Sequence, residues 1–365
     1  MKKQKQSFWA GLALAAVLIP GLCWAVSRHD NPHRYSKPPE SFLSDILLRG
    51  IEGDSSIVCA SIGLARVGSG KAPETVVWAW DAREHRWAAR YGYDELPLPP
   101  GGIMQTATYT YLLDKELMKV DEQIPTRNGR IPEFRADRRY PADMHIVDFE
   151  RTTGRDSISL REGFLRNMHY VSDLLALERL TSYDWPNART FVGWLGDAFG
   201  SADAFFLPKF DYQGKVFPAE FASIADGTGV LLSQGQVLSF YGALAHGGVK
   251  PAGKGYRSRH ICSKKTAEEM CGLLRENVLS GTAARLSDCG VSVAAKTGFG
   301  MLDKGRITGD GVASLSVTSL AGFFPADAPE YTLCVTLYST LSVKGGESAC
   351  IFKEVVHHLM EEGKR

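Results

Sequence analysis

The sequence predicts an α+β fold, in which an antiparallel sheet is flanked by helices and a second lobe is entirely helical. Apolar runs bounded by glycine and proline lie near both ends of the chain, which is typical of strands. The middle of the chain instead repeats apolar residues at helical spacing. The 365 residues are 44% hydrophobic and 23% charged, as in ordinary globular proteins. Strands on both sides of a helical middle fit one shared sheet, so we expect two lobes in a single folding unit.

The elements follow from local patterns along the chain. Pro97 to Gly102 interrupts the chain before a helix, and Gly247-Gly248 ends another one, as a helix stop does. Residues 121–156 have few apolar side chains and three prolines, which favours long loops. In chain order, we expect helices at residues 41–50, 103–120, 159–180, 190–199, 233–246, 264–279 and 349–360, and strands at 57–65, 75–80, 291–298, 316–324 and 331–339.

The amino-terminal 40 residues predict a membrane anchor followed by a linker. Residues 8–26 are uncharged, and a helix of that length spans about 28 Å, close to the hydrocarbon thickness of a bilayer. Three lysines precede the run and Arg28 follows it, which favours a cytoplasmic leader at 1–7 and a transmembrane signal anchor at 8–26. A cleaved signal peptide is the alternative, because Pro20 and Gly21 could end a short apolar core. A polar linker at 27–40 and one extracytoplasmic domain at 41–365 complete this division.

Charge and cysteine content argue against nucleic-acid and metal binding. A net charge of +1 and a pI near 7.6 provide no field for a polyanion. The seven cysteines contain no C-x-x-C pattern, and His357-His358 has no ligand partner at useful spacing. We therefore expect no nucleic-acid partner, no metal and no cofactor. Cys23 lies in the predicted anchor, and the other six cysteines could pair or stay as buried free thiols.

Lys296-Thr297-Gly298, on the predicted strand 291–298, is the motif that suggests chemistry. Alone it is weak evidence, because an edge strand can carry a solvated lysine by chance. Its surroundings strengthen it: Gly281-Thr282-Ala283 precedes it, Ala321-Gly322-Phe323 follows it, and a glycine-rich segment at 224–236 leads into a helix that ends at Ala243 to Val249. In this order, over roughly residues 40–362, the chain resembles the transpeptidase domain of the penicillin-binding proteins. These are serine acyl-transferases of the β-lactamase-like superfamily, and the resemblance implies their fold, a penicillin-binding transpeptidase-like α+β arrangement.

The resemblance also shows where catalytic side chains are missing. Such enzymes carry Ser-x-x-Lys at the start of a buried helix, with the lysine one turn from the serine. That motif falls on Gly102 and Gln105, which can neither attack a carbonyl nor accept a proton at neutral pH. The second motif, Ser-x-Asn, falls on Asn167 and His169. No serine anywhere in the chain precedes a lysine by three residues. The resemblance therefore implies a degenerate site with no catalytic residues, in which His169 is structural and Phe299 makes the cleft narrower and drier.

The function expected from this combination is binding without catalysis. We expect a membrane-anchored relative of the transpeptidases in the bacterial inner membrane. Its partners would be envelope proteins of peptidoglycan synthesis or division, such as a polytopic glycan polymerase. Lys296, Thr297 and Gly298 remain as ligand-binding candidates, since Lys296 could attract a peptide carboxylate; a lysine in a salt bridge or in solvent is the alternative.

Two other functions stay open. One is an active D,D-transpeptidase or carboxypeptidase with a displaced nucleophile, such as Ser55 or Ser56. The other is a sensor that binds stem peptides or a β-lactam without turnover.

Overall fold

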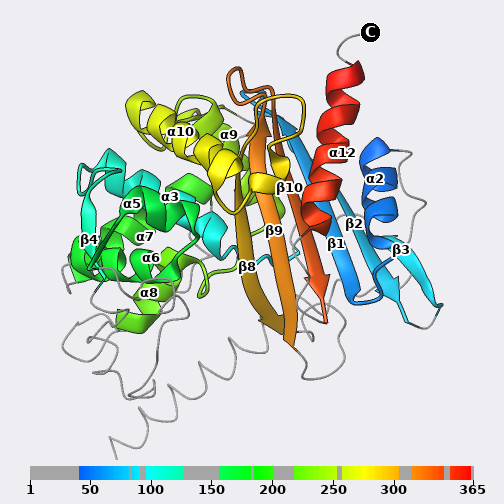
Figure 1. The fold of residues 1–365 in the computed structure, drawn as a ribbon, viewed down its shortest axis with the longest axis horizontal. Helices are drawn as coiled ribbons and strands as arrows, with labels where there is room; N and C mark the ends of the chain where they lie inside the picture. Colours follow the sequence, from blue (N-terminus) through cyan, green and yellow to red (C-terminus); the bar gives the residue numbers. More distant parts are fainter. Residues whose placement is uncertain are drawn as a thin grey trace, which may run out of the picture.

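A six-stranded antiparallel sheet forms the centre of the computed structural model (Figure 1). The structure describes residues 41–82, 84–90, 96–126, 156–181, 185–200, 218–252, 257–303, 314–340 and 346–362. The predicted leader, anchor and linker at 1–40 lie outside these residues. Within the described part of the chain, no helix is both long and apolar enough to cross a membrane.

The sheet joins strands from the two ends of the domain, as the sequence predicted. Its order is β3-β2-β1-β10-β9-β8. β1 lies between β2 and β10, with Ile62 opposite Val335. The predicted strand at 291–298 begins later and runs further, and the edge strand β3 was not predicted. The strands are β1 (Ile57–Arg66), β2 (Glu74–Asp81), β3 (Arg86–Arg90), β8 (Ala294–Asp303), β9 (Ser314–Phe324) and β10 (Tyr331–Ser339).

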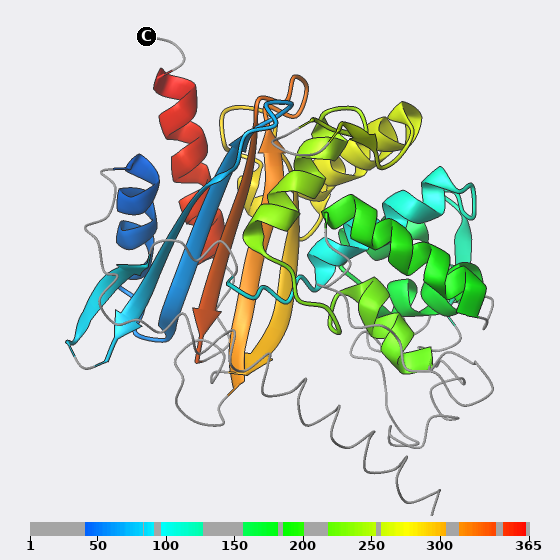
Figure 2. The same ribbon diagram turned by 180° about the vertical axis from the view of Figure 1, so that it is seen from behind.

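Helices cover both faces of this sheet. α2 (Phe42–Ile51) and α12 (Glu347–Glu362) pack side by side on one face (Figure 1). Seen from behind, α9 (Gln234–Ala245) crosses the other face (Figure 2), and α10 (Lys264–Ser280) packs against β8. Because both faces are covered, every residue of β10 is buried. The α+β transpeptidase-like arrangement expected from the sequence is therefore present.

The second lobe surrounds a buried helix, α3 (Gly102–Asp114), whose residues 102–113 are all buried. One predicted helix, at 159–180, is interrupted at residues 166–168, where Asn167 adopts a left-handed backbone with φ 55°. The remaining elements are β4 (Gln123–Pro125), β5 (Ser157–Ser159), α5 (Leu160–Leu165), α6 (His169–Leu175), the π-helical η3 (Ala176–Thr181), α7 (Trp185–Phe199), α8 (Pro218–Asp226), β6 (Val249–Lys250), β7 (Arg259–His260) and η4 (Ala284–Leu286). The lobe is thus mainly helical, with the short β4–β5 ladder beside its helices. Residues 127–155 of the predicted loop stretch lie outside the described residues.

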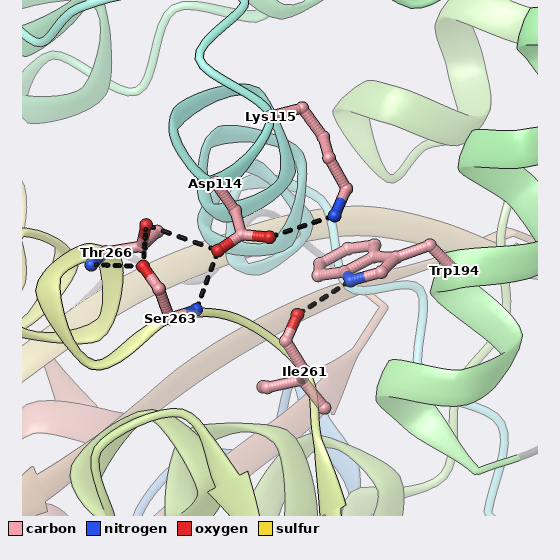
Figure 3. Close-up of polar contacts among 6 residues, drawn as sticks. All are labelled: Asp114, Lys115, Trp194, Ile261, Ser263 and Thr266. Atoms are coloured by element: carbon pink, nitrogen blue, oxygen red, sulfur yellow. Dashed lines mark hydrogen bonds and ion pairs between the residues drawn. The ribbon is translucent and has the colours of Figure 1, made fainter.

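A polar cluster joins this lobe to α10 (Figure 3). The backbone N–H of Ser263 donates to Asp114 Oδ1 at 2.7 Å, and Lys115 Nζ donates to Asp114 Oδ2 at 3.0 Å. The indole N–H of Trp194 donates to the Ile261 carbonyl at 2.8 Å. Asp114, at the end of α3, therefore accepts a hydrogen bond from the residue that caps α10.

The six cysteines within the described residues are free thiols. Burial raises the pKa of Cys262 and of Cys271 to about 12. These two thiols therefore stay protonated at neutral pH and behave as small apolar side chains. In the same residues, no group of three or more His, Cys, Asp or Glu is arranged to hold a metal ion.

Candidate functional site

The structure brings the three predicted motifs together at the start of α3. Gly102 is the first residue of this helix, Asn167 lies in the turn between α5 and α6, and Thr297 lies on β8. A Cβ atom added at Gly102 would stand 1.8 Å from Asn167 Oδ1 and 2.7 Å from the Thr297 carbonyl oxygen. The carboxamide of Asn167 therefore occupies the place that a side chain at position 102 would need.

The backbone of β8 lies directly on the segment that leads into α3. A Cβ atom at Gly101 would stand 2.0 Å from the Phe299 carbonyl oxygen, and one at Gly298 would stand 2.2 Å from that of Pro100. Gly101 also has a φ of 48°, a conformation that glycine adopts without steric cost. The Phe299 ring itself is 44% exposed, so the strand backbone, rather than this ring, covers the helix start.

Lys296 is completely buried in this contact, with 0% of its surface exposed. Its Nζ donates a hydrogen bond to Asn167 Oδ1 and lies 5.0 Å from the centre of the Phe164 ring. Burial lowers the pKa of Lys296 to about 7, because the charged form loses its hydration. Lys296 is thus neither in solvent nor paired with a carboxylate among the described residues. Its role in ligand binding stays a prediction.

Gln105 lies one helical turn after Gly102 and is also completely buried. Neither its amide nitrogen nor its amide oxygen has a hydrogen-bonding partner among the described protein atoms. Unpaired buried polar atoms are rare and cost free energy. The side chain that the resemblance aligns with the family's basic amine is thus a neutral amide; the alignment itself stays a prediction.

His169 ties α6 to the end of α8. Its Nδ1 forms a hydrogen bond of 3.2 Å with Asp226 Oδ2. The other oxygen of Asp226 accepts from the backbone N–H and the hydroxyl of Thr228, at 2.8 and 2.7 Å. The imidazole is thus held by a buried carboxylate that also orders the glycine-rich segment, which fits the structural role expected for it.

Asn277 is a positioning residue that the sequence analysis missed. It is fully buried on α10, where its amide nitrogen donates to the Ala295 carbonyl at 2.9 Å. Its Oδ1 accepts from the backbone N–H of Thr282 at 3.1 Å, and the Thr297 hydroxyl donates to that of Thr282 at 2.7 Å. A polar residue on the apolar face of the predicted helix 264–279 was the available signal. Asn277 links the Gly281-Thr282-Ala283 motif to β8.

The comparisons with known proteins agree with this arrangement. A peptidoglycan synthetase from Bifidobacterium adolescentis ATCC 15703 superposes on this chain with a TM-score of 0.64 and 16% sequence identity. The superposition covers 88% of this chain and 59% of the synthetase chain. A peptidoglycan glycosyltransferase from Burkholderia ambifaria superposes with a TM-score of 0.62 and 16% identity, over 88% of this chain and 94% of its own. No curated protein matches the sequence.

At 16% identity, the two solved structures show only that this chain shares their fold, which is the transpeptidase-like fold. Residues 187–357 match the family model of the penicillin binding protein transpeptidase domain. Over these residues the match confirms the transpeptidase domain that the motifs predicted. The matched segment contains Lys296 but begins after Gly102 and Asn167.

Proposed function

We propose that this member of the penicillin-binding protein family acts in peptidoglycan synthesis or division by binding rather than by acyl transfer. The observation that supports the proposal is that a protein side chain fills the space beside Gly102, where the family's nucleophile is expected. The Asn167 carboxamide takes the space of a side chain at position 102 and accepts a hydrogen bond from buried Lys296. Loss of the nucleophile alone costs about 10⁶ in rate in a comparable enzyme. In addition, the side chain at the expected position of the base, Gln105, is a neutral amide that does not accept a proton at neutral pH.

The geometry also argues against a displaced nucleophile. Across the sheet, Lys296 of β8 pairs with Ala321 of β9, and Ala321 pairs with Cys334 of β10. Cys334 in turn pairs with Gly63 of β1. Ser56 lies seven residues before Gly63, which is about 23 Å along the strand direction at about 3.3 Å per residue. Its hydroxyl accepts a hydrogen bond from that of Ser339 at 3.0 Å, and Ser55 lies one residue further away. This separation supports the proposal that neither serine acts as the nucleophile.

Labelling with a fluorescent penicillin tests the absence of acyl transfer. We expect no covalent label on the purified full-length protein after denaturation, since no serine stands at the start of α3. A catalytically competent penicillin-binding protein, treated in parallel, provides the positive control. A single labelled serine would overturn the proposal, and Ser55→Ala and Ser56→Ala would then show whether either is the nucleophile.

The proposal includes one helix in the bacterial inner membrane, with the domain outside the cytoplasm. The uncharged run at 8–26 and its flanking positive charges support this placement. Both structural neighbours are named for peptidoglycan synthesis, which supports partners in the same machinery, such as a polytopic glycan polymerase. A pull-down from detergent-solubilised membranes tests for that partner, and recovery of no protein of wall synthesis would count against it.

A further inference from the structure

An amine and a carboxamide are held against each other beside α3. Lys296 Nζ donates a hydrogen bond to Asn167 Oδ1, so the carbonyl carbon of that carboxamide, Cγ, is one bond away from the contacted atom. Lys296 is fully buried and lies over the Phe164 ring. Asn167 is fixed by its left-handed backbone and by its own N–H, which donates to the Phe164 carbonyl at 3.1 Å. Both reacting groups are therefore positioned by the fold.

The surroundings favour attack of this amine on this carbonyl. Asn167 Oδ1 lies against Gly102, the first residue of the 13-residue helix α3. The N-terminal end of a helix stabilises negative charge, which develops on a carbonyl oxygen under nucleophilic attack. Burial lowers the pKa of Lys296 to about 7, so a substantial fraction of the amine is neutral and nucleophilic near neutral pH. Asn167 is only half-buried, which leaves a route to solvent for a small leaving group.

We propose that Lys296 and Asn167 join in an intramolecular isopeptide bond. Lys296 Nζ bonds to Asn167 Cγ, the Cγ–Nδ2 bond breaks, and one hydrogen moves from Nζ to Nδ2, which leaves as ammonia. No atom is oxidised or reduced and no co-reactant is needed. Two groups fixed in contact react with an effective concentration far above that of free reactants, on the order of 10⁵ M or more.

The cross-link ties β8 of the sheet to the turn between α5 and α6 in the other lobe. The two residues are 129 positions apart in the chain, so the bond closes a long loop and restricts the unfolded state. It also keeps the Asn167 side chain permanently at the start of α3. This inference goes beyond the proposed binding function and does not depend on any partner.

Mass spectrometry of the denatured full-length protein tests the bond. We expect a mass one ammonia lower than that calculated from the residue at which the purified chain begins. Trypsin should fail to cut after Lys296, so residues 167–179 should be recovered joined to residues 286–304. Lys353 is the internal control, because its amine pairs with the Asp288 carboxylate while only 26% of its side chain is exposed, and trypsin should cut normally between Lys353 and Glu354.

Substitutions identify the two atoms that react. Lys296→Arg and Asn167→Ala should restore the full mass, whereas Asn167→Asp should lose one water in place of one ammonia. A wild-type chain of full mass would overturn the proposal, as would an ammonia loss that maps to other residues. The wild-type measurement decides the question even where a variant fails to fold. Penicillin labelling detects an ester on a serine, whereas the mass measurement detects an amide between Lys296 and Asn167. The failure of the binding proposal can therefore be distinguished from the failure of the isopeptide proposal.

Discussion

Gly102 lies at a position whose side-chain space is filled by its neighbours. The sequence identifies it as the missing nucleophile, because glycine has no side chain. The structure adds that the vacated space is taken by Asn167, which reaches it from a left-handed turn that interrupts a predicted helix. A serine at position 102 would therefore meet both the Asn167 carboxamide and the Thr297 carbonyl.

Substitution at Gly102 tests this close contact. We expect Gly102→Ala to lower the free energy of unfolding by about 1–3 kcal/mol, because the new methyl group overlaps Asn167 and the β8 backbone. Gly272→Ala is the matched control: Gly272 is exposed on α10 with nothing within 4 Å of its Cβ position. That change should raise the unfolding free energy by about 0.5–1 kcal/mol through helix propensity. Urea denaturation measures the free energy of unfolding of both variants. An unchanged free energy for Gly102→Ala would contradict the close contact.

The junction between α3 and α10 depends on a carboxylate at a helix end. Asp114 accepts hydrogen bonds from Ser263 and Lys115 at the start of the 17-residue helix α10. Burial opposes ionisation of Asp114, but these hydrogen bonds outweigh it and lower its pKa below the ordinary 3.8. Because the folded pKa is lowered, the stabilisation is fully present above about pH 4 and is lost as the pH falls through the folded value.

Asp114→Asn tests this junction. We expect a loss of about 1–2 kcal/mol in unfolding free energy at pH 7, since hydrogen bonds to a charged acceptor become neutral ones. The difference from the wild type should shrink as the pH falls below about 4, because the wild-type carboxyl takes up a proton first in the unfolded state and then, as the pH passes its lowered pKa, in the folded state. Asp288→Asn provides the control, because Asp288 pairs with Lys353 while 71% of its side chain is exposed, and exposed pairs contribute little to stability. Equal losses in both variants would exclude a special role for the junction.

Predicted elements differ from the observed ones where tertiary contacts outweigh local preference. The strand β10 has the predicted bounds, because its residues are mainly apolar, aromatic or β-branched and are buried on both faces. The predicted helix at 159–180 is broken at Asn167, which hydrogen-bonds to Lys296 across 129 residues. Local periodicity contains no information about a partner that far away in the chain.

The whole domain depends on strands contributed by both ends of the chain. The family model matches residues 187–357, but the sheet also needs β1 and β2, and the second lobe is built around α3. β1 supplies the neighbour of β10, so removing it exposes a long apolar edge. We therefore expect the two lobes to unfold as one cooperative unit.

A truncation tests whether the two lobes fold cooperatively. We expect residues 41–365 to unfold in a single transition, followed by circular dichroism and by tryptophan fluorescence. Residues 187–365 should be insoluble or unfolded, because they lack three of the six strands of the sheet and the buried helix α3. A folded 187–365 fragment, or two separate transitions for 41–365, would show that the lobes fold independently.

The amino-acid sequence was sufficient to predict the class of fold and to show that the chain has no Ser-x-x-Lys motif. Both depend on which side chains are present and on their spacing, and these are local properties of the chain. The contacts at the start of α3 became visible only in the folded molecule: the Asn167 carboxamide against Gly102, Lys296 buried against Asn167, and the β8 backbone closed over Gly101. These contacts join segments that are far apart in the chain, and their energies arise from packing and desolvation that exist only once the lobes have met.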